Sequence, residues 1–568
     1  MRRSSAWIIF SITLAIFAVF FLLPLFLVIG GGVFENGRPT LKYVFGVFQH
    51  PIYREGLFNS FLIAVGTTTL VCCIAIPLAW LTNRYDFPGK KLVSGLVLVP
   101  MILPPFVGAI GFQQMFGQFG SFNTLFDLGP IDWIGRARLP GVILLQALSL
   151  YPILYLNVSA ALANIDPAME EAAQNLGSNG WTRFRRITLP LIMPGLFAGG
   201  TIVFIWSFTE LGTPLILNYE RCTPVQVFDA LKEIGTSNFP YALVLVMLTA
   251  SVLLYSISKF FFGRQSFAMQ SKAATVGGVI DATGLRGVLV LLPFALVIFI
   301  ALLPHVGVVL TSVTQPGSWY RSVLPQTFTT ANYVEALGHG MTVSSIKNSL
   351  IYSSLAIIFN VVLGIAIAMV VVRSTLWFRG LLDALAMLPL AVPGLVMAFG
   401  YLAISTGLAN LDWVKNSDLL TRLFDVREDP TLFLVIAYGM RRLPYMVRSA
   451  VAGLQQTSIT FEEASANLGA GAFTTLRKIT LPLITANLIA GALLAFAFSM
   501  LEVSDSLMLA QRQDSYPITK TIYELFQLIG TGKYVASALG VWAMVFLAVT
   551  IIGASLILGR KLGALFRV

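Results

Sequence analysis

Residues 170–177 of the chain read Glu-Glu-Ala-Ala-Gln-Asn-Leu-Gly, and residues 462–469 read Glu-Glu-Ala-Ser-Ala-Asn-Leu-Gly. Each copy continues to the same ending, Ile-Thr-Leu-Pro-Leu-Ile, which occupies 187–192 and 479–484. The matched positions are all 292 residues apart. Both copies are polar islands in an apolar chain, so the duplication predicts one partner that is contacted twice, or two copies of a partner.

The composition indicates an all-α polytopic membrane protein. Of 568 residues, 57% are hydrophobic and 11% are charged, whereas a soluble domain carries roughly 25% charged residues. A helix needs about 20 apolar residues to span a bilayer, and we find about twelve such stretches. The predicted spans are 7–30, 57–82, 92–115, 140–163, 191–213, 241–262, 287–311, 348–372, 381–404, 431–453, 482–505 and 536–559.

The distribution of charge predicts the orientation. With the N-terminus inside, the inner segments hold more basic than acidic residues, while the outer segments hold equal numbers. The net charge of +11 therefore reflects topology, not nucleic-acid binding. Both termini and both copies of the repeat are expected on the cytoplasmic side. The first apolar stretch exceeds the length of a signal peptide, so we expect a retained helix.

The duplication extends beyond the repeat itself. Pro104 pairs with Pro393 at a spacing of 289 residues, and Glu210 pairs with Glu502 at 292. The chain is thus predicted to be two homologous six-helix halves in parallel. The expected divisions are 1–56 (first helix and outer segment), 57–262 (first membrane core), 263–286 (cytoplasmic linker), 287–346 (seventh helix and outer segment), 347–559 (second membrane core) and 560–568 (cytoplasmic tail).

Each copy of the repeat predicts a short helix, a turn and a second short helix. We name 166–190 the first repeated segment and 458–482 the second repeated segment. In the first, Asp166 is a good N-cap before proline, and Gly177 suits the left-handed residue beyond the helix end. A second short helix is expected over 181–187, before the next membrane span.

Glu-Ala-Ala, then Gly, then Ile-x-Leu-Pro resembles the cytoplasmic signature of bacterial ABC-importer permeases that work with a binding protein. In that family the loop docks into a cleft of the ATPase subunit, and the resemblance implies the type I ABC importer permease fold. It covers roughly 57–262 and 347–559. Ser465 and Ala486 depart from the first copy, where Ala173 and Pro194 stand. The implied docking residues, flanked by the matching Ile187 and Ile479, are Glu170, Glu171, Ala172, Ala173, Gly177, Leu189 and Pro190 in the first segment, and Glu462, Glu463, Ala464, Gly469, Leu481 and Pro482 in the second.

A fused permease of this kind is most similar to the ferric-iron branch, on phrases such as Leu-Pro-Pro-Phe-Val-Gly at 103–108. The resemblance implies two copies of a cytoplasmic ABC ATPase, a periplasmic substrate-binding protein, and a place in the bacterial inner membrane. It also implies that ATP and Mg belong to the ATPase, with no cofactor in this chain. Phosphonate, thiamine, polyamine or sulfate-like cargo remains the alternative within the same architecture. An ion-coupled secondary transporter and a non-transporting scaffold are the rivals outside it.

Ionisable groups inside membrane helices are costly and are functional candidates. Glu210, Glu502 and Asp505 are expected near the outer membrane surface, where they attract a cation, contact the binding protein, or cap helix ends. Replacing both glutamates with Gln is expected to lower uptake without lowering folded yield. Arg441 and Arg442, with Arg448, either reach the cytoplasmic interface or line an inner cavity that handles an anion or a chelated metal.

Prolines predict breaks in two helices, because Pro removes a backbone donor. The third span holds Pro100, Pro104 and Pro105, and the ninth holds Pro389 and Pro393. We expect these breaks to line a gate or to bend the helices for packing.

Other candidate chemistry is weak. Gly-Thr-Gly-Lys at 530–533 lacks the first glycine and the final Ser/Thr of a phosphate-binding loop, so no nucleotide site is expected. The three histidines lack metal-ligand spacing, so no metal site is expected. Cys72 and Cys73 are expected to be small core fillers, and Cys222 lies alone in an outer loop.

Overall fold

The protein is described by a computed structural model that covers residues 3–35, 37–102, 104–136, 138–233, 237–262 and 280–558. Most of the predicted linker and the predicted tail (560–568) lie outside these residues. The helices of the first half are α1 (Arg3–Phe17), η1 (Ala18–Leu22), α2 (Leu23–Val33), α3 (Lys42–Gln49), α4 (Pro51–Arg84), α5 (Lys90–Leu96), α6 (Val99–Ile102), α7 (Pro105–Phe116), α8 (Ser121–Leu125), α9 (Trp133–Arg136), α10 (Arg138–Ala163), α11 (Pro167–Asn175), α12 (Gly180–Arg183), η2 (Phe184–Thr188), α13 (Leu189–Thr209), α14 (Gly212–Ile216), α15 (Thr223–Asp229), η3 (Ala230–Glu233) and α16 (Phe239–Phe262).

The second half repeats this order. Its helices are α17 (Gly284–Ser312), α18 (Ala331–Gly338), α19 (Gly340–Arg373), α20 (Arg379–Met387), η4 (Leu388–Leu390), α21 (Gly394–Ala409), α22 (Asp412–Lys415), α23 (Asp418–Phe424), α24 (Thr431–Gln456), α25 (Thr460–Asn467), α26 (Ala472–Thr475), η5 (Leu476–Thr480), α27 (Leu481–Met500), α28 (Ser504–Leu509), η6 (Gln513–Ser515), α29 (Ile518–Phe526) and α30 (Gly532–Leu558). The long helices correspond, since α4 and α19 have 34 residues each and α10 and α24 have 26 each. The prediction of two homologous halves is confirmed.

Strands are few in the part of the chain that the structure describes. β1 (Phe34–Glu35) pairs antiparallel with β2 (Arg38–Pro39). β3 (Tyr85–Asp86) pairs in parallel with β4 (Ile280–Asp281), so the start of the second half is fastened to the end of α4. The backbone N–H of Ala282 also donates to the carbonyl of Asp86 (2.8 Å).

The number of membrane spans agrees with the prediction. Among the described residues, nine helices are long and apolar enough to cross a membrane, or up to eleven when each of two bent pairs is one span. α24 is also long enough, at 26 residues, but it carries three arginines. With α24 the set matches the predicted spans one by one.

The predicted proline breaks are confirmed. The third span bends by 91° between 90–101 and 105–125, and the ninth bends by 97° between 379–390 and 394–409. Pro104 is extended, with ψ 119°, because a following proline disfavours the helical conformation. Pro393 is extended as well, with ψ 134°, directly before Gly394 starts α21.

Each half has the same packing plan, and the halves exchange their first helices. In each half the long helix packs along its partners, α4 along α10 and α13, and α19 along α24 and α27. α2 packs against α16 of its own half and α21 of the other. α17 likewise packs against α30 of its own half and α7 of the other. The first membrane helix of each half therefore holds the two halves together.

Glycines permit this exchange. A Cβ on Gly111 of α7 would lie 2.1 Å from the carbonyl oxygen of Pro304 in α17. A Cβ on Gly400 of α21 would lie 2.7 Å from Cβ of Pro24 in α2. Small residues at such crossings let helix backbones approach closely in membranes. Because 111 and 400 are 289 residues apart, the crossing belongs to the duplication.

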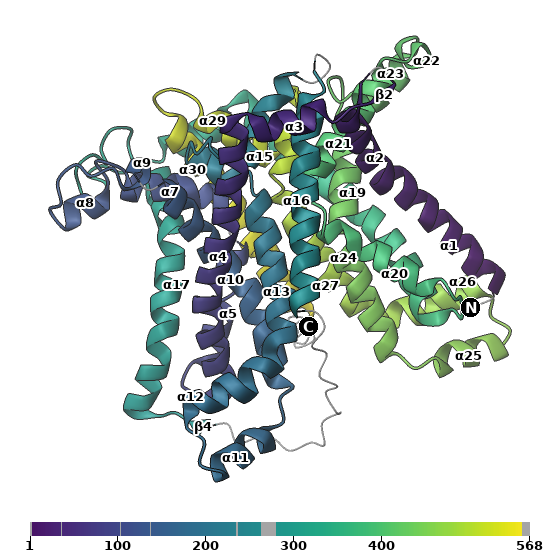
Figure 1. Cartoon of the computed structure of the whole chain (residues 1–568), viewed down its shortest axis with the longest axis horizontal. Helices are drawn as coiled ribbons and strands as arrows, with labels where there is room; N and C mark the ends of the chain where they lie inside the picture. Colours follow the sequence, from purple (N-terminus) through teal and green to yellow (C-terminus); the bar gives the residue numbers. More distant parts are fainter. Residues whose placement is uncertain are drawn as a thin grey trace.

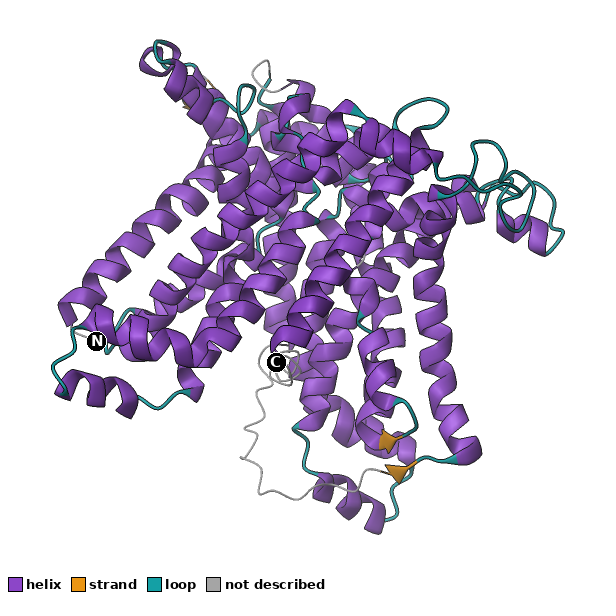
Figure 2. Ribbon diagram, turned by 180° about the vertical axis from the view of Figure 1, so that it is seen from behind, coloured by secondary structure: helices purple, strands orange, loops and turns teal. Residues whose placement is uncertain are grey.

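The halves lie side by side, with equivalent elements at the same end (Figure 1). α11 and α25 lie at one end of the molecule, whereas α3, α15, α22 and α29 lie at the other. Seen from behind, the ribbons of the two halves spread apart toward the end that carries α11 and α25 (Figure 2). The two repeated segments thus project from the same side of the protein.

Candidate functional site: the repeated segments and the central cavity

The first repeated segment folds through local capping. The Asp166 carboxylate accepts a hydrogen bond from the N–H of Ala168 (3.0 Å), so it caps α11 as predicted. Gly177 ends this helix with φ +80°, a conformation that glycine adopts without steric cost. The side chain of Asn179 accepts from the N–H of Thr182 (2.8 Å) and caps α12. Sequence reasoning missed this second cap.

The second repeated segment has the same fold, but different hydrogen bonds stabilise it. Gly469 has φ +84° at the position matching Gly177. Ser458 accepts from the N–H of Thr460 (3.3 Å) where the first copy has an aspartate cap. Ser465 shares a hydrogen bond with Thr475 (2.9 Å between hydroxyl oxygens), which ties α25 to α26. The replacement of Ala173 by Ser465 in the second copy thus adds a hydrogen bond inside the segment.

The second short helix differs from its prediction over 181–187. α12 continues without a break through the π-helical turn η2 into α13, and α26 continues through η5 into α27. In both copies proline follows the π turn at the second position of the long helix. A proline ring clashes with the carbonyl four residues back, so a wider turn before it accommodates the ring. A push on α12 or α26 therefore acts directly on a membrane helix.

Three apolar side chains of each repeated segment face outward, and sequence reasoning did not include them among the docking residues. They are matched at the 292-residue spacing, which was the available signal. The exposed fractions are 48% and 54% for Met169 and Phe461, 88% and 89% for Leu176 and Leu468, and 69% and 76% for Trp181 and Phe473. Exposed apolar patches of this kind mark interaction sites. We call the three residues in each repeated segment its apolar docking face.

The predicted docking residues differ in their surroundings: most lie at or near the surface, but two glutamates turn inward. The side chains of Glu171, Ala172, Glu463 and Ala464 are exposed beside the apolar docking face. Ala173, Leu189, Pro190 and Leu481 are half-buried, while Gly177, Gly469 and Pro482 are exposed. Glu170 and Glu462 instead turn toward the membrane helices, where each is paired with an arginine.

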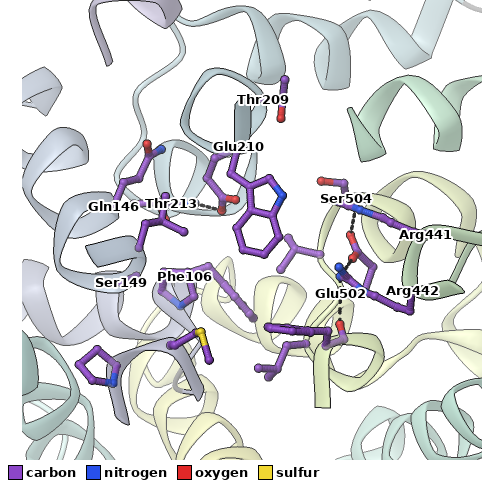
Figure 3. Close-up of a pocket in the computed structure, with 18 residues that line it drawn as sticks. Phe106, Gln146, Ser149, Thr209, Glu210, Thr213, Arg441, Arg442, Glu502 and Ser504 are labelled. Atoms are coloured by element: carbon purple, nitrogen blue, oxygen red, sulfur yellow. Dashed lines mark hydrogen bonds and ion pairs between the residues drawn. The ribbon is translucent and has the colours of Figure 1, made fainter. Parts of the chain in front are cut away.

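A cavity lies between the two halves, and its largely apolar lining also carries charged and polar side chains. Its volume is about 130 Å³. The first half contributes Gln146, Ser149, Glu210 and Thr213, and the second half contributes Arg441, Arg442, Glu502 and Ser504 (Figure 3). We call this space the central cavity.

The charges of the central cavity are distributed unequally between its walls. Arg441 Nη1 lies 2.5 Å from Glu502 Oε1, and Arg442 is ion-paired with the other carboxylate oxygen of Glu502. Asp505 Oδ2 lies 3.7 Å from Arg441 Nη1. On the opposite wall, Glu210 Oε1 accepts from the N–H of Thr213 (3.3 Å). Among the described residues Glu210 is in no ion pair, because Ser149 and Leu150 occupy the positions that match the arginines.

The structure places these acidic residues at a cavity, which the sequence did not reveal. Glu210 and Glu502, which are expected near the outer membrane surface, line the central cavity, and Asp505 is buried beside Glu502. The rise of α13 and α27 was estimated correctly, but α14–α15 and α28–α29 follow them with mostly buried residues. Thr213 of α14 and Ser504 of α28 line the cavity beside the carboxylates, and periodicity alone does not reveal that.

Two alternatives were expected for the arginines. Arg441 is the eleventh residue of the 26 in α24, about 15 Å from its start. The alternative expectation, that Arg441 and Arg442 line a cavity, agrees with the structure. Arg448 lies apart from them and is ion-paired with Asp383 (3.4 Å).

The remaining candidates form no site in the described residues. No group of three or more His, Cys, Asp or Glu residues there could hold a metal ion. Burial raises the pKa of the Cys222 thiol to about 12, which makes it a poor nucleophile. Cys73 is exposed on α4 and Cys72 is half-buried, so the expectation of two core fillers fails for Cys73.

The fold and the site define a class of protein. Two homologous six-helix halves share a cavity lined in part by charged side chains, and each half presents a pair of short helices at the same end, so the chain is a duplicated, multi-pass membrane protein. It belongs to the family of binding-protein-dependent transport system inner membrane components, whose model matches residues 73–269 and 360–562. The family places it in the inner membrane as a component of transport, not as an enzyme.

Similar proteins carry informative names. The chain is 27% identical over 471 residues to the ferric transport system permease protein FbpB of Actinobacillus pleuropneumoniae, which covers 80% of this chain and 64% of that protein. A putative ferric transport system permease protein FbpB 1 of Haemophilus influenzae is 27% identical, over 80% of this chain and 69% of that protein. A probable molybdenum ABC transporter permease of Haloferax volcanii is 30% identical, over 42% of this chain and 84% of that protein.

Among solved structures, a bacterial ABC transporter involved in the import of alginate has a chain with 16% sequence identity and a TM-score of 0.39. The likeness covers 46% of this chain and 96% of that chain.

Proposed function

We propose that the chain is the transmembrane permease of an ATP-driven, binding-protein-dependent importer, and that its cargo is ferric iron. The observation that carries this proposal is the apolar docking face, present twice at the same end of the molecule. A face of Leu, Trp, Phe and Met side chains beside exposed carboxylates and alanines suits the cleft of a folded partner. Two such faces suit two copies of one cytoplasmic ATPase, which supplies the ATP and Mg site.

The orientation follows from the same proposal. Both repeated segments lie on the cytoplasmic side, together with both termini. A periplasmic binding protein delivers cargo at the opposite end. ATP binding closes the ATPase dimer and draws the repeated segments together, and the continuous paths from α12 into α13 and from α26 into α27 pass this motion to the membrane helices.

Ferric iron is favoured over the alternatives by the extent of similarity. The relatives named for ferric transport are aligned over 80% of the chain, hence across both halves, whereas the relative named for molybdenum is aligned over 42%. Molybdate, sulfate, phosphonate, thiamine and polyamine cargoes are the alternatives that an uptake assay separates.

The central cavity is the proposed pathway for cargo. It lies between the halves, where a rocking motion would open it first to one side and then to the other. Its buried polar groups Gln146 Nε2, Thr213 Oγ1 and Arg442 Nε have no hydrogen-bond partner among the described residues. Such groups favour a polar occupant, because an unsatisfied buried polar atom is costly. Glu210 faces the same space and supplies a carboxylate for a cationic cargo.

The test is reconstitution. The chain, its ATPase and its binding protein are placed in liposomes, and the internal accumulation of radioactive iron is followed with ATP or with a non-hydrolysable analogue. We expect iron uptake that requires ATP hydrolysis and the binding protein. Uptake driven by an ion gradient without any ATPase would establish the rival secondary transporter. Accumulation of molybdate or sulfate instead of iron would reject the cargo, and no accumulation of any cargo would favour a scaffold.

A further inference from the structure

Two partly buried ion pairs connect the repeated segments to the longest helices of the protein. Arg84, the last residue of α4, places Nη1 2.6 Å from Glu170 Oε2. Arg373, the last residue of α19, places Nε 3.0 Å from Glu462 Oε1. The arginines are 289 residues apart and the glutamates 292, so the two ion pairs belong to the duplication.

The glutamates of these pairs point away from the apolar docking face. Successive residues of an α-helix are rotated by about 100°, so neighbours face different directions. Glu171 and Glu463 are exposed, whereas Glu170 and Glu462 have side-chain exposures of 22% and 17%. Each repeated segment thus offers one carboxylate to a partner and keeps one for the membrane domain.

Each arginine suits a mechanical link. A cation at a helix C-terminus is stabilised by the helix dipole, which favours an ordered side chain at the ends of α4 and α19. A charge-assisted hydrogen bond is short and directional, and partial burial protects it from screening by salt. Since α4 packs along α10 and α13, and α19 along α24 and α27, a displacement of either glutamate reaches three long helices.

The two links are built differently. Thr188 donates from Oγ1 to Glu170 Oε1 (2.8 Å), so the first carboxylate is held from two sides. At the matching position in the second half, the Thr480 hydroxyl is buried with no hydrogen-bond partner among the described residues. There Arg373 makes the additional contact, donating from Nη2 to the carbonyl of Thr457 (3.0 Å) at the end of α24.

We infer that Glu170 and Glu462 are positioning residues, which transmit movement of the repeated segments to α4 and α19 through Arg84 and Arg373. Loss of a link leaves the docking face intact but lets the segment move without its helix. ATP is then hydrolysed without a matching transport step. The inference rests on the proposed function, since it concerns how ATP hydrolysis is coupled to uptake.

Charge reversal tests the links in the reconstituted complex, with iron uptake and ATP hydrolysis measured on the same liposomes. We expect Arg84→Glu and Arg373→Glu each to lower the ratio of iron taken up to ATP hydrolysed by about fivefold or more, as typical coupling energies give. The exchanged pairs, Arg84→Glu with Glu170→Arg and Arg373→Glu with Glu462→Arg, restore the ratio. A role limited to folding would change yield and both rates together, and not their ratio.

Controls separate the possible failures. Asp418 and Arg422 on α23 form an exposed ion pair, with Arg422 Nε 3.4 Å from Asp418 Oδ2. Exchanging these two residues should leave the ratio of iron taken up to ATP hydrolysed unchanged. Where a charge reversal prevents folding, the ratio of iron taken up to ATP hydrolysed is measured for Glu170→Gln and Glu462→Gln instead. These substitutions remove the charge and keep the shape of the side chain. If the wild-type complex transports iron and all single variants keep its ratio, the links are not coupling elements. If the wild-type complex does not transport, the proposed function itself fails.

Discussion

At the scale of single residues, two glutamates in equivalent positions have different surroundings. Glu502 is 4% exposed and is ion-paired with Arg441 and Arg442, whereas Glu210 faces the central cavity without an ion pair among the described residues. The duplication supplied both carboxylates, but the arginines occur in α24 alone of the two equivalent helices, α10 and α24. Glu502 is therefore held by ion pairs, whereas Glu210 remains open to an occupant of the central cavity.

This difference predicts that replacing glutamate with glutamine lowers stability at position 502 but lowers uptake at position 210. Glu502→Gln leaves two buried cations without their partner, and breaking a buried ion pair costs about 3–5 kcal/mol, so we expect a lower folded yield and a lower Tm in detergent. Glu210→Gln, its matched control, keeps the wild-type Tm and lowers iron uptake. The structure thus revises the expectation from sequence that both variants would fold normally.

Thermal unfolding followed by size-exclusion chromatography, together with uptake in liposomes, checks the pair. Equal Tm values for the two variants would contradict the assignment of Glu502 to the structure. Wild-type uptake by Glu210→Gln would remove Glu210 from the proposed pathway.

At the scale of elements, the exchange of first helices depends on two close crossings. Gly400→Ala in α21 places a Cβ 2.7 Å from Cβ and 2.8 Å from the carbonyl oxygen of Pro24. Backbone of α2 cannot yield as a flexible side chain would, and overpacking typically costs about 1–3 kcal/mol. We expect a lower Tm for Gly400→Ala. Gly407→Ala lies in the same helix with nothing within 4 Å of the added Cβ, so it should keep or raise the Tm.

A Gly400→Ala variant that is as stable as Gly407→Ala would mean that α2 and α21 are not in this contact in the folded protein. The comparison uses one helix and one substitution, so helix propensity cancels. Differential scanning fluorimetry of both variants in the same detergent is sufficient.

The elements also define what sequence could predict. The spans, the proline breaks and the helix ends at Gly177 and Gly469 were predictable, because apolar length, missing donors and left-handed glycines are local properties. The exchange of α2 and α17 between halves was not, because it depends on contacts between distant segments. The place of Glu210 and Glu502 at the central cavity was missed for the same reason, since residues of both halves line that cavity.

At the scale of the whole molecule, the duplication gives two docking faces that need not be equal. The apolar docking face carries Met, Leu and Trp in the first half and Phe, Leu and Phe in the second. Inside the segments the hydrogen bonds also differ, since Thr188 donates to Glu170 in the first and Ser465 bonds to Thr475 in the second. If one ATPase dimer grips both faces, the loss of either face weakens the complex, and the loss of both removes it.

The two exposed leucines test this arrangement. Burying a leucine side chain contributes about 1.5–3 kcal/mol, and each 1.4 kcal/mol is tenfold in affinity, so Leu176→Asp and Leu468→Asp should each weaken ATPase binding by about tenfold or more. The double variant should lose co-purifying ATPase and ATP-dependent uptake. Trp413→Asp, at a side chain 54% exposed on α22 at the opposite end, should keep both.

Affinity purification of the complex, with ATPase quantified per permease, distinguishes three arrangements. Equal losses in the two single variants indicate that both faces hold the ATPase alike. A larger loss of bound ATPase from one leucine variant indicates that the two docking faces contribute unequally, as the different hydrogen bonds inside the two segments suggest. Full ATPase binding by the double variant would show that α11 and α25 do not dock the ATPase through their exposed leucines, and the partner would then have to grip a surface outside the duplicated face.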